Sequence, residues 1–382
     1  MSPNNTTNHA ASILIATGGT SGHIYPALAI AEALRSRRPE LRIVFCGMRG
    51  GQEEGIAATH DFPFSPLLAQ NMPSKNDPRY FSWFVNNVRG ILQSRRILKK
   101  EQPKLVIGTG GYVSAPLMWV ARQKRVPYIL HEQNSIPGRA NLMFAKEADT
   151  VFISYDVSRR HFSDKDNLVL SGNPVRPVFF TLDRREARAA LGVPDTTFLV
   201  LMTGGSQGAR TLNRAVAGLR DLDAWHRLIE RHPNLLLVHS VGINQDECLA
   251  EALSTIPNVS AKSYINNTAY WCAACDFFMG RAGAMTCAEV AASGKPSMLI
   301  PYPYAADDHQ TSNARALEEA GAAFVVLDDA FTSATLVETV ERMIEDAPLR
   351  HAMGERARAQ STPNAAPMIA EHVLAMIDGA PR

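Results

Sequence analysis

The sequence contains no hydrophobic run long enough to cross a membrane and no recognisable secretion signal. Across its 382 residues, no apolar stretch approaches the roughly 18 residues that a transmembrane helix needs. Residues 1–11 are polar and rich in Asn and Thr, without the basic and apolar regions of a signal peptide. These absences argue against a helical integral membrane protein and predict a protein of the cytosol.

The sequence also has little net charge and few cysteines. A formal net charge of +2 excludes a generally basic nucleic-acid-binding protein and an acidic disordered chain. The five cysteines are an odd number and are scattered, which favours reduced thiols over a disulfide framework. They are Cys46, Cys248, Cys272, Cys275 and Cys287.

Two of these cysteines, in Trp271-Cys272-Ala-Ala-Cys275, have the spacing of a redox motif. Such a motif follows a strand and opens a helix. Here Asn266-Asn267-Thr268 is typical of a helix start, so the cysteines fall at the end of that helix. Because no second cysteine pair completes a zinc site, we interpret both thiols as packing residues.

Short apolar runs alternate with amphipathic stretches along the chain, which indicates parallel α/β sheets, one in each half. Two domains are expected, over residues 1–175 and 176–359, because the length exceeds what one core usually serves. The boundary is predicted near residues 171–177, where two prolines and a glycine precede a helix that starts near Asp183. A last helix, around Pro367 to Ile377 within residues 360–382, is expected to return to the first domain. Besides the runs that begin at Ile13 and Phe198, the expected strands are Leu41–Cys46, Leu105–Ile107, Tyr128–Leu130, Val151–Ile153, Leu235–Val238, Phe277–Met279, Ser297–Ile300 and Phe324–Leu327.

Two glycine-rich turns each follow an apolar run and open a helical pattern. They are Gly18-Gly19-Thr20-Ser21-Gly22-His23 and Gly204-Gly205-Ser206-Gln207-Gly208-Ala209. Such a turn leaves helix N–H groups free to bind phosphate, so two of them predict an enzyme with two phosphate-bearing partners. The first turn lacks the spacing of a dinucleotide fingerprint, and no acidic residue ends the next strand, so NAD is not expected.

Polar residues gather after the predicted strands of the first half. His23 lies in the first turn of its helix, where the positive helix end favours a neutral imidazole that accepts a proton. A capping or packing histidine is the alternative. Residues 108–116 form a third glycine-rich turn, and His131-Glu132-Gln133-Asn134 ends the following strand. Since ligands bind at the carboxyl edge of an open α/β sheet, we expect these residues to contact ligands.

In the second half, residues 281–289 follow a strand and open a helix, which places Glu289 near the first turn. Its carboxylate suits a ribose diol, and complementation of the helix dipole is the alternative. Asp307-Asp308 precedes another helix, but one acidic pair does not make a metal cage. We expect no obligatory metal ion or cofactor.

A set of motifs, in chain order, resembles the MurG family of bacterial N-acetylglucosaminyltransferases, in glycosyltransferase family 28. The motifs are Gly-Gly-Thr-x-Gly-His, Gly-Gly-Tyr-Val-Ser, His-Glu-Gln-Asn, Gly-Asn-Pro-Val-Arg, Gly-Gly-Ser-Gln-Gly-Ala, Arg-x-Gly-Ala-x-Thr-x-x-Glu and Asp-Asp-His-Gln-x-x-Asn-Ala. The resemblance extends from about Ile13 to Ala320 and, more loosely, to the end of the chain. It implies a GT-B fold, in which two Rossmann-like, doubly wound parallel-sheet domains face a deep cleft.

The resemblance also implies a reaction. Enzymes of this family transfer GlcNAc from UDP-GlcNAc to the C4 hydroxyl of MurNAc in undecaprenyl-diphospho-MurNAc-pentapeptide (lipid I). The products are lipid II and UDP, in peptidoglycan synthesis, and the anomeric configuration inverts. The expected partners are UDP-GlcNAc, lipid I and the membrane surface at the cytoplasmic face. Cell-wall synthesis proteins are candidate partners, and nucleic acid is not expected.

Matched motif by motif, the resemblance assigns roles to individual residues. His23 is the expected general base, and Glu132 is the alternative for acid–base chemistry. The acceptor would contact Gly19, Thr20, Ser21, Gly22, Tyr112 and Asn134. The donor would contact Arg176, Ser206, Gln207, Ile265, Ala284, Met285, Glu289 and Gln310, with His309 and Asn313 as further candidates.

Two regions depart from the family pattern. Ser21 stands where the family usually has glycine, which restricts the backbone if that position needs a positive φ. Residues 47–75 differ from the acceptor-side loops of the family. The altered turn leaves a non-catalytic nucleotide-sugar sensor as an alternative function. A second alternative is a related enzyme that uses UDP-GlcNAc differently, such as a transferase to another lipid or an epimerase.

The stretch from Arg79 to Lys100 combines aromatic and basic side chains and contains no acidic residue. An amphipathic helix of this composition suits attachment to an anionic membrane surface. A helix packed on the sheet is the alternative.

Overall fold

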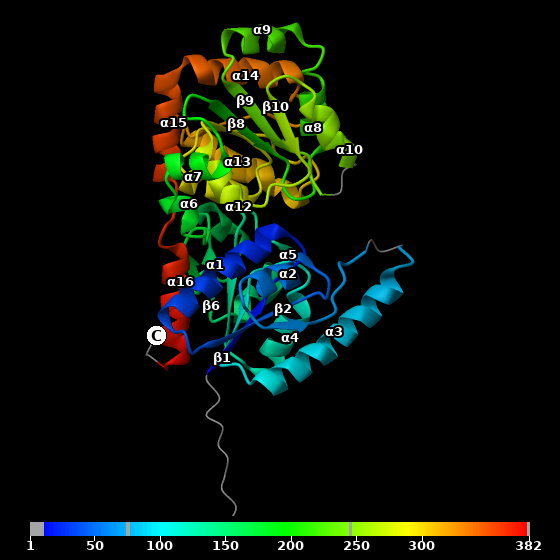
Figure 1. The fold of residues 1–382 in the computed structure, drawn as a ribbon. Coiled ribbons are helices and arrows are strands. Elements are labelled where there is room, and N and C mark those ends of the chain that lie inside the picture. Colours follow the sequence, from blue (N-terminus) through cyan, green and yellow to red (C-terminus); the bar gives the residue numbers. More distant parts are fainter. Residues whose placement is uncertain (1–10, 74–76, 244–246, 380–382) are drawn as a thin grey trace, which may run out of the picture. The chain divides into compact units, whose positions relative to one another are not determined.

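The computed structural model describes residues 11–73, 77–243 and 247–379, which divide into two compact units (Figure 1). The N-terminal unit holds the chain up to Pro174 together with the segment from Asn364, and the C-terminal unit runs from Val175 to Pro363. The break falls inside the 171–177 stretch. Residues 1–10, on which the expectation of no signal peptide depends, and Lys75 lie outside the described residues.

The sheet of the N-terminal unit is parallel throughout, and its described strands follow the order β3-β2-β1-β4-β5-β6-β7. They are β1 (Ser12–Ala16), β2 (Arg42–Gly47), β3 (Phe64–Pro66), β4 (Leu105–Gly108), β5 (Tyr128–Glu132), β6 (Thr150–Ile153) and β7 (Leu168–Leu170). The strand order reverses between β1 and β4. The loops after these two strands therefore border the switch point at which doubly wound sheets bind ligands.

Helices cover both faces of this sheet. They are α1 (Ser21–Arg37), α2 (Gln52–Thr59), α3 (Tyr80–Glu101), α4 (Ala115–Lys124), α5 (Arg139–Phe144) and α16 (Ala365–Ile377), with 3-10 turns at Ala145–Glu147 and Asp156–His161. Because successive strand residues point to opposite faces, Ile13 and Ile15 pack with α1 and α16, whereas Leu14 and Ala16 pack with α4. The last helix, α16, thus belongs to the N-terminal unit, beside α1.

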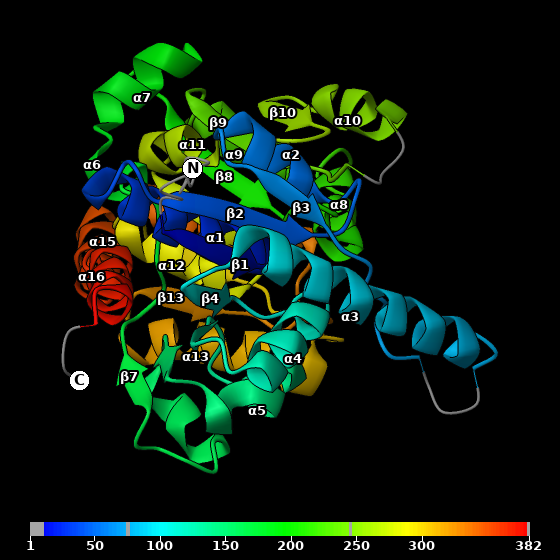
Figure 2. The same cartoon turned by 90° about the horizontal axis from the view of Figure 1, so that it is seen from below.

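Helix α3 lies beside α4, and its N-terminal end projects from the unit (Figure 2). The buried residues of the helix are Gly90 at its middle and Ser94 and Leu98 in its C-terminal half. In the N-terminal half, Phe81 is 77% exposed and Phe84 58% exposed. The expectation of a packed helix thus holds for the C-terminal half alone.

The C-terminal unit repeats the parallel arrangement, with its described strands in the order β10-β9-β8-β11-β12-β13. The strands are β8 (Phe198–Thr203), β9 (Leu235–Ser240), β10 (Val259–Lys262), β11 (Phe277–Gly280), β12 (Ser297–Leu299) and β13 (Ala323–Val325). The helices are α6 (Val178–Thr181), α7 (Arg184–Leu191), α8 (Arg210–Ala217), α9 (Asp223–Arg231), α10 (Glu247–Ser254), α11 (Thr268–Ala274), α12 (Ala284–Ala292), α13 (His309–Glu319), α14 (Ser333–Glu345) and α15 (Ala347–Ala359), with a 3-10 turn at Ala306–Asp308. Here the strand order reverses between β8 and β11, so the second glycine-rich turn and the 281–285 loop border this switch point.

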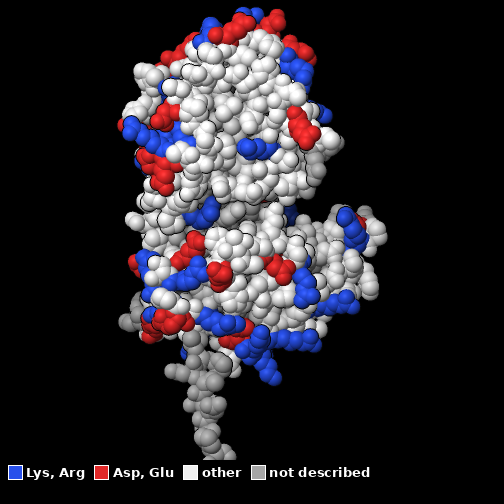
Figure 3. Space-filling view, viewed as in Figure 1, with Lys and Arg blue, Asp and Glu red and all other residues white. Residues whose placement is uncertain are grey.

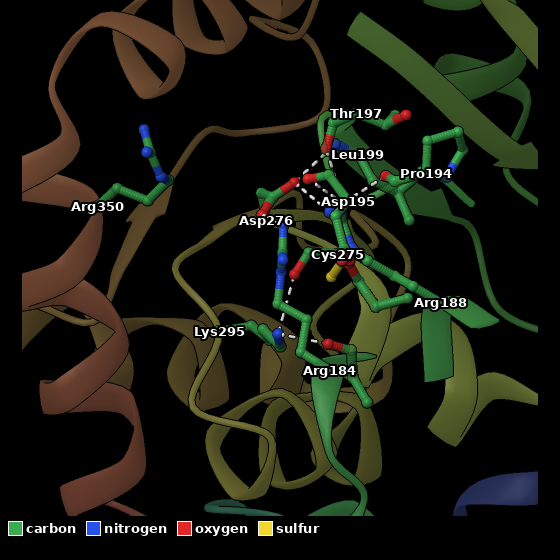
Figure 4. A network of polar contacts seen from close by, with 12 residues as sticks. Arg184, Arg188, Pro194, Asp195, Thr197, Leu199, Cys275, Asp276, Lys295 and Arg350 are labelled. Carbon is green, nitrogen blue, oxygen red and sulfur yellow. Dashed lines mark hydrogen bonds and ion pairs between the residues drawn. The ribbon is translucent and has the colours of Figure 1, made fainter. Parts of the chain in front are cut away.

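A buried arginine ties the amino ends of these strands to the surrounding helices (Figure 4). Arg188 of α7 donates hydrogen bonds to the carbonyl oxygens of Pro194, Thr197 and Ala274, at 2.9, 2.9 and 3.0 Å. Its Nη2 lies 2.7 Å from Oδ2 of Asp276, which also accepts the backbone N–H of Leu199 in β8 at 2.8 Å. These acceptors thus replace water around the Arg188 guanidinium, whose side chain is only 1% exposed.

Each of the strands expected from the sequence is present, with ends that differ by one or two residues. The cysteines of the Trp271 motif lie at the end of α11, as the helix-start pattern predicts. Both thiols are buried, and burial raises the pKa of Cys275 to about 11. A thiol that stays protonated at neutral pH is a poor redox nucleophile, which favours the packing interpretation.

Candidate active site

At the switch point of the N-terminal unit, two glycine-rich loops come into close contact. A Cβ on Gly111, after β4, would lie 2.5 Å from the Gly18 carbonyl oxygen, after β1. A Cβ on Gly110 would lie 3.2 Å from Nδ1 of His23. Both glycines have positive φ, at 92° for Gly110 and 75° for Gly111. Only glycine fits both the conformation and the space, which explains the Gly-Gly pair of the motif.

His23 lies against these loops in the first turn of α1, with its ring partly exposed. Its Nδ1 lies 3.0 Å from the Thr109 carbonyl oxygen and 3.0 Å from Oε1 of Gln133. A carbonyl oxygen only accepts, so Nδ1 carries a hydrogen, and in the neutral ring Nε2 then has the lone pair. Among the described residues, no hydrogen bond to Nε2 is formed. This arrangement suits a general base.

Glu132, the alternative base, is buried and fully hydrogen-bonded. One carboxylate oxygen accepts from the backbone N–H and the side-chain amide of Asn134, at 2.9 and 3.1 Å. The other accepts from the Gly138 backbone N–H and from Asn141 Nδ2, at 2.9 and 2.8 Å. A carboxylate has about four lone-pair sites, and all are used. The geometry indicates that Glu132 organises the 134–141 loop.

The candidate acceptor residues fall into two places. Thr20 is the N-cap residue of α1, Ser21 and Gly22 begin that helix, and Gly19 precedes it. Tyr112 lies beside this turn, because a Cβ on Gly19 would be 3.4 Å from the Tyr112 ring. Asn134 instead lies on the loop after β5, where its backbone N–H and side-chain amide donate to the Glu132 carboxylate.

Ser21 is not among the described residues with positive φ. It begins α1 with ordinary backbone, so the departure from glycine at this position causes no strain.

In the C-terminal unit, the second glycine-rich turn packs against the loop after β9. The backbone N–H of Ile243 donates to the Ser206 carbonyl oxygen at 3.0 Å. A Cβ on Gly208 would lie 1.8 Å from the Val241 carbonyl oxygen, so this position excludes any side chain. The side chain of Gln207 is exposed beside it. The turn is therefore fixed in shape while part of it stays open to a ligand.

Glu289 and Arg176 form the charged part of the donor candidates. Burial raises the pKa of the partly exposed Glu289 carboxyl to about 7, and the positive charge of Arg176 opposes this shift. The guanidinium of Arg176 lies 5.3 Å from the ring centre of Phe179 in α6, which packs on α12. Ile265 and Met285 belong to the same buried cluster, and Ala284 begins α12. The structure thus gathers these donor candidates around the start of α12.

Arg281, which the sequence places beside them, has its guanidinium directed into the unit. It lies 2.6 Å from Asp328 and donates to the carbonyl oxygens of Ile300 and Pro301. Its function in this arrangement is to fix the loop after β12.

The third set of residues expected to bind the sugar donor lies at the start of α13. Oε1 of Gln310 accepts the backbone N–H of Tyr302 at 3.0 Å, which leaves its amide hydrogens for other partners. His309 Nδ1 lies 2.7 Å from the Ala306 carbonyl oxygen. Asn313 is fully buried, with Nδ2 3.4 Å from the Ala282 carbonyl oxygen, and so joins α13 to the 281–285 loop. Within the described residues, no group of three or more His, Cys, Asp and Glu side chains gathers as metal ligands.

Ligand contacts are expected from all four residues of His131-Glu132-Gln133-Asn134, but the first three are buried. Thr109, named only as part of the 108–116 turn, contacts His23, and Asn141, which the sequence does not point to, contacts Glu132. The glycine-rich context of Thr109 is its one local signal, and no local pattern marks Asn141, because its partner lies elsewhere in the chain.

Comparisons with known proteins agree with this architecture. The N-terminal domain of glycosyltransferase family 28 matches residues 13–153, and the C-terminal domain of that family matches residues 199–369. The structure of Acinetobacter baumannii MurG superposes with a TM-score of 0.69, covering 96% of this chain and 99% of that one at 24% identity. A putative UDP-N-acetylglucosamine 2-epimerase from Listeria monocytogenes superposes with a TM-score of 0.71 at 13% identity, covering 98% of this chain and 99% of that one. Together with the two Rossmann-like sheets, these matches define a GT-B glycosyltransferase.

The closer relatives fix the family. A protein from Caldicellulosiruptor saccharolyticus is 37% identical over 360 residues, which are 93% of this chain and 95% of the relative. One from Acetivibrio thermocellus is 35% identical over 364 residues, 94% of this chain and 96% of the relative. Both are named UDP-N-acetylglucosamine--N-acetylmuramyl-(pentapeptide) pyrophosphoryl-undecaprenol N-acetylglucosamine transferase. The chain belongs to this family of N-acetylglucosamine transferases, the MurG family.

Proposed function

We propose that this enzyme transfers GlcNAc from UDP-GlcNAc to the C4 hydroxyl of MurNAc in lipid I, which gives lipid II and UDP. The observation that carries this proposal is the identity of 35–37% with relatives of that name over almost the whole chain. The hydroxyl attacks the anomeric carbon as UDP leaves from the opposite face, so the α-linked donor gives a β-linked product.

His23 is the general base of this reaction. Its Nδ1 is held by the Thr109 carbonyl oxygen, which leaves Nε2 to take the proton of the attacking hydroxyl. Glu132 supports the site indirectly, since its oxygens hold the loop from Asn134 to Asn141. The turn of Gly19, Thr20, Ser21 and Gly22, with Tyr112 beside it and Asn134 on the neighbouring loop, contacts the acceptor.

The C-terminal unit binds the donor. Arg176 and the amides of the 204–208 turn, with Ser206 and Gln207, stabilise the leaving diphosphate, so that no metal ion is required. Removing one such preorganised hydrogen-bond donor typically raises the activation barrier by on the order of 3 kcal/mol. Ile265, Ala284 and Met285 surround the uracil, Glu289 accepts from the ribose hydroxyls, and Gln310, with His309 and Asn313 nearby, binds GlcNAc.

The N-terminal unit, up to Pro174 and from Asn364, also meets the membrane that carries lipid I, and the unit from Val175 to Pro363 is the donor domain. No described helix is long and apolar enough to span a bilayer. Helix α3 offers a surface for peripheral attachment instead. Its exposed apolar residues, Phe81, Phe84, Val88 and Leu92, follow one another at helical spacing.

Beyond this stripe of exposed apolar residues, basic side chains follow towards the C-terminal end of α3 (Figure 3). We define the basic cluster as Arg95, Arg96, Lys99 and Lys100, all exposed. An apolar stripe inserted among lipids and a basic cluster on anionic headgroups would hold the enzyme at the cytoplasmic face of the plasma membrane.

The test of the transfer reaction is acceptor-dependent release of UDP from UDP-GlcNAc. We expect release with a short-chain lipid I analogue and none without it. An epimerase would convert UDP-GlcNAc with no acceptor, and a nucleotide-sugar sensor would bind it without turnover. Either result would contradict the proposal.

A further inference from the structure

Behind His23, a chain of hydrogen bonds runs into the interior of the N-terminal unit. Oε1 of Gln133 faces His23 Nδ1 at 3.0 Å, and Nε2 of Gln133 lies 2.9 Å from His131 Nδ1. Nε2 of His131 lies 3.1 Å from the carbonyl oxygen of Gly172. His131 and Gln133 are both buried, so neither touches a substrate directly.

The hydrogens of this chain can be placed by elimination, starting from its buried end. The Gly172 carbonyl oxygen only accepts, so Nε2 of His131 carries a hydrogen. Burial lowers the pKa of His131 to about 4, which keeps the ring neutral near pH 7. A neutral ring with a hydrogen on Nε2 has its lone pair on Nδ1. That lone pair faces the Gln133 NH₂ group, whose two hydrogens are shared between it and two carbonyl oxygens.

The orientation of the Gln133 amide follows in the same way. Its Nε2 lies 3.0 Å from the Thr109 carbonyl oxygen, 3.0 Å from the His131 carbonyl oxygen and 2.9 Å from His131 Nδ1. All three are acceptors, so the flipped amide would place its oxygen against two carbonyl oxygens. Oε1 must therefore face His23, where it meets a hydrogen and not a lone pair.

We propose that Gln133 and His131 are positioning residues for the transfer reaction. His131 orients the Gln133 amide, and the amide oxygen, together with the Thr109 carbonyl oxygen, keeps the hydrogen of neutral His23 on Nδ1. When Nε2 takes the proton of the acceptor hydroxyl, the same two oxygens stabilise the positive charge of the ring. The catalytic part of this inference rests on the proposed function, whereas the tautomer does not.

The tautomer is tested by nitrogen-15 NMR of histidine-labelled protein at about pH 8.5, where an imidazole is neutral. His23 is assigned by the signal that the His23→Ala variant loses. We expect wild-type His23 to carry its hydrogen on Nδ1. In Gln133→Met, which keeps the size of the side chain but removes the amide, we expect the Nε2–H form to appear.

The exposed Gln360→Met, in the C-terminal unit, is the matched control and should leave the His23 signals unchanged. A wild-type His23 with its hydrogen on Nε2, or a Gln133→Met spectrum identical to wild type, would overturn the inference. This measurement needs no turnover, so it holds or fails separately from the proposed function.

Kinetics test the catalytic part. Gln133→Met should lower kcat by about tenfold or more with KM for both substrates within about threefold, since the change acts on the base and not on substrate contacts. The loss should stay below the about 10⁴-fold that a wrong histidine tautomer costs in serine proteases, because the Thr109 carbonyl oxygen remains. In a His23→Ala background, the same substitution should change kcat by less than about twofold.

An equal loss of kcat in both backgrounds would mean a structural effect and would refute the catalytic part. Should Gln133→Met not fold, His131→Phe tests the same link while leaving Gln133 in place. It should lower kcat in the same direction, again only when His23 is present. An unchanged kcat in a folded His131→Phe variant would also refute the positioning role of His131.

Discussion

Replacing Glu132 by glutamine separates two functions of this residue, because a general base and a loop organiser respond differently to the change. Glutamine keeps the size and shape of glutamate but has one oxygen and one NH₂ group. The four donors around Glu132 are the backbone N–H and amide of Asn134, the Gly138 N–H and the amide of Asn141. After the substitution, one pair of these donors faces an NH₂ group.

The cost can be worked out from these contacts. In the most favourable case the side-chain amide opposite the new NH₂ group flips to accept from it, and one backbone N–H stays buried without an acceptor. That N–H costs about 1–3 kcal/mol, and each remaining bond loses about 1 kcal/mol because its acceptor is no longer charged. We therefore expect Glu132→Gln to lower the free energy of unfolding of the N-terminal unit by about 4–6 kcal/mol, or the unfolding temperature by roughly 8–24 °C.

The assay measures the stability of Glu132→Gln and of His23→Gln by thermal and urea unfolding, and the kcat of both variants. His23 is partly exposed, so His23→Gln should lose activity with a change in stability below about 1 kcal/mol. Glu132→Gln should lose stability as well as activity. Wild-type stability combined with lost kcat in Glu132→Gln would refute the loop function and restore Glu132 as a base.

Three further predictions follow from other parts of the structure. Arg188→Ala should destabilise the C-terminal unit by about 3–5 kcal/mol in urea unfolding, because it leaves several buried carbonyl groups without a donor and removes the buried charge that pairs with Asp276. Arg184→Ala, which removes a side chain 40% exposed on the same aspartate, should cost under about 1 kcal/mol, and similar costs for both variants would contradict the network. Burial raises the Glu289 pKa from 4.5 to about 7, so the unfolded chain releases this proton at a lower pH than the folded chain does. The stability of the wild type relative to Glu289→Gln should therefore fall as the pH rises from about 4.5 through about 7. Parallel stability–pH profiles of the two proteins would rule out this pKa shift. Reversing the basic cluster to glutamate should weaken binding to anionic vesicles by on the order of 10²- to 10³-fold in co-sedimentation, because each basic residue contributes about 1 kcal/mol. The same reversal of exposed arginines in the C-terminal unit (Arg185, Arg210, Arg214 and Arg227) should have little effect, and equal losses would refute the α3 attachment.

The sequence predicts the central strands and the glycine-rich turns because both depend on local signals. Apolar runs mark strands that are covered on both faces, and glycines mark the positions where two loops approach closely. Strands β3, β7 and β10 escape prediction, because they are short edge strands with few buried residues. The C-terminal half of α3 packs on the unit, as the packed-helix interpretation expects, whereas attachment of the exposed apolar residues to a membrane stays a prediction.

The polar interior of the site is not predictable from local signals. Whether Glu132 serves as a base or as a loop organiser depends on Gly138 and Asn141, and the protonation of His131 depends on a carbonyl group at Gly172. These partners are backbone groups or amides that carry no pattern of their own. Only the fold brings them to the end of β5.

The central claim is that His23 serves as the base in transfer of GlcNAc to lipid I. The most direct measurement is the incorporation of radiolabelled GlcNAc from UDP-GlcNAc into a short-chain lipid I analogue, by wild type and by His23→Ala with equal donor binding. We predict labelled lipid II from the wild type and a loss of at least about 10²-fold in the variant. Equal incorporation by both would remove His23 from the mechanism, and no incorporation by the wild type would contradict the transfer reaction itself.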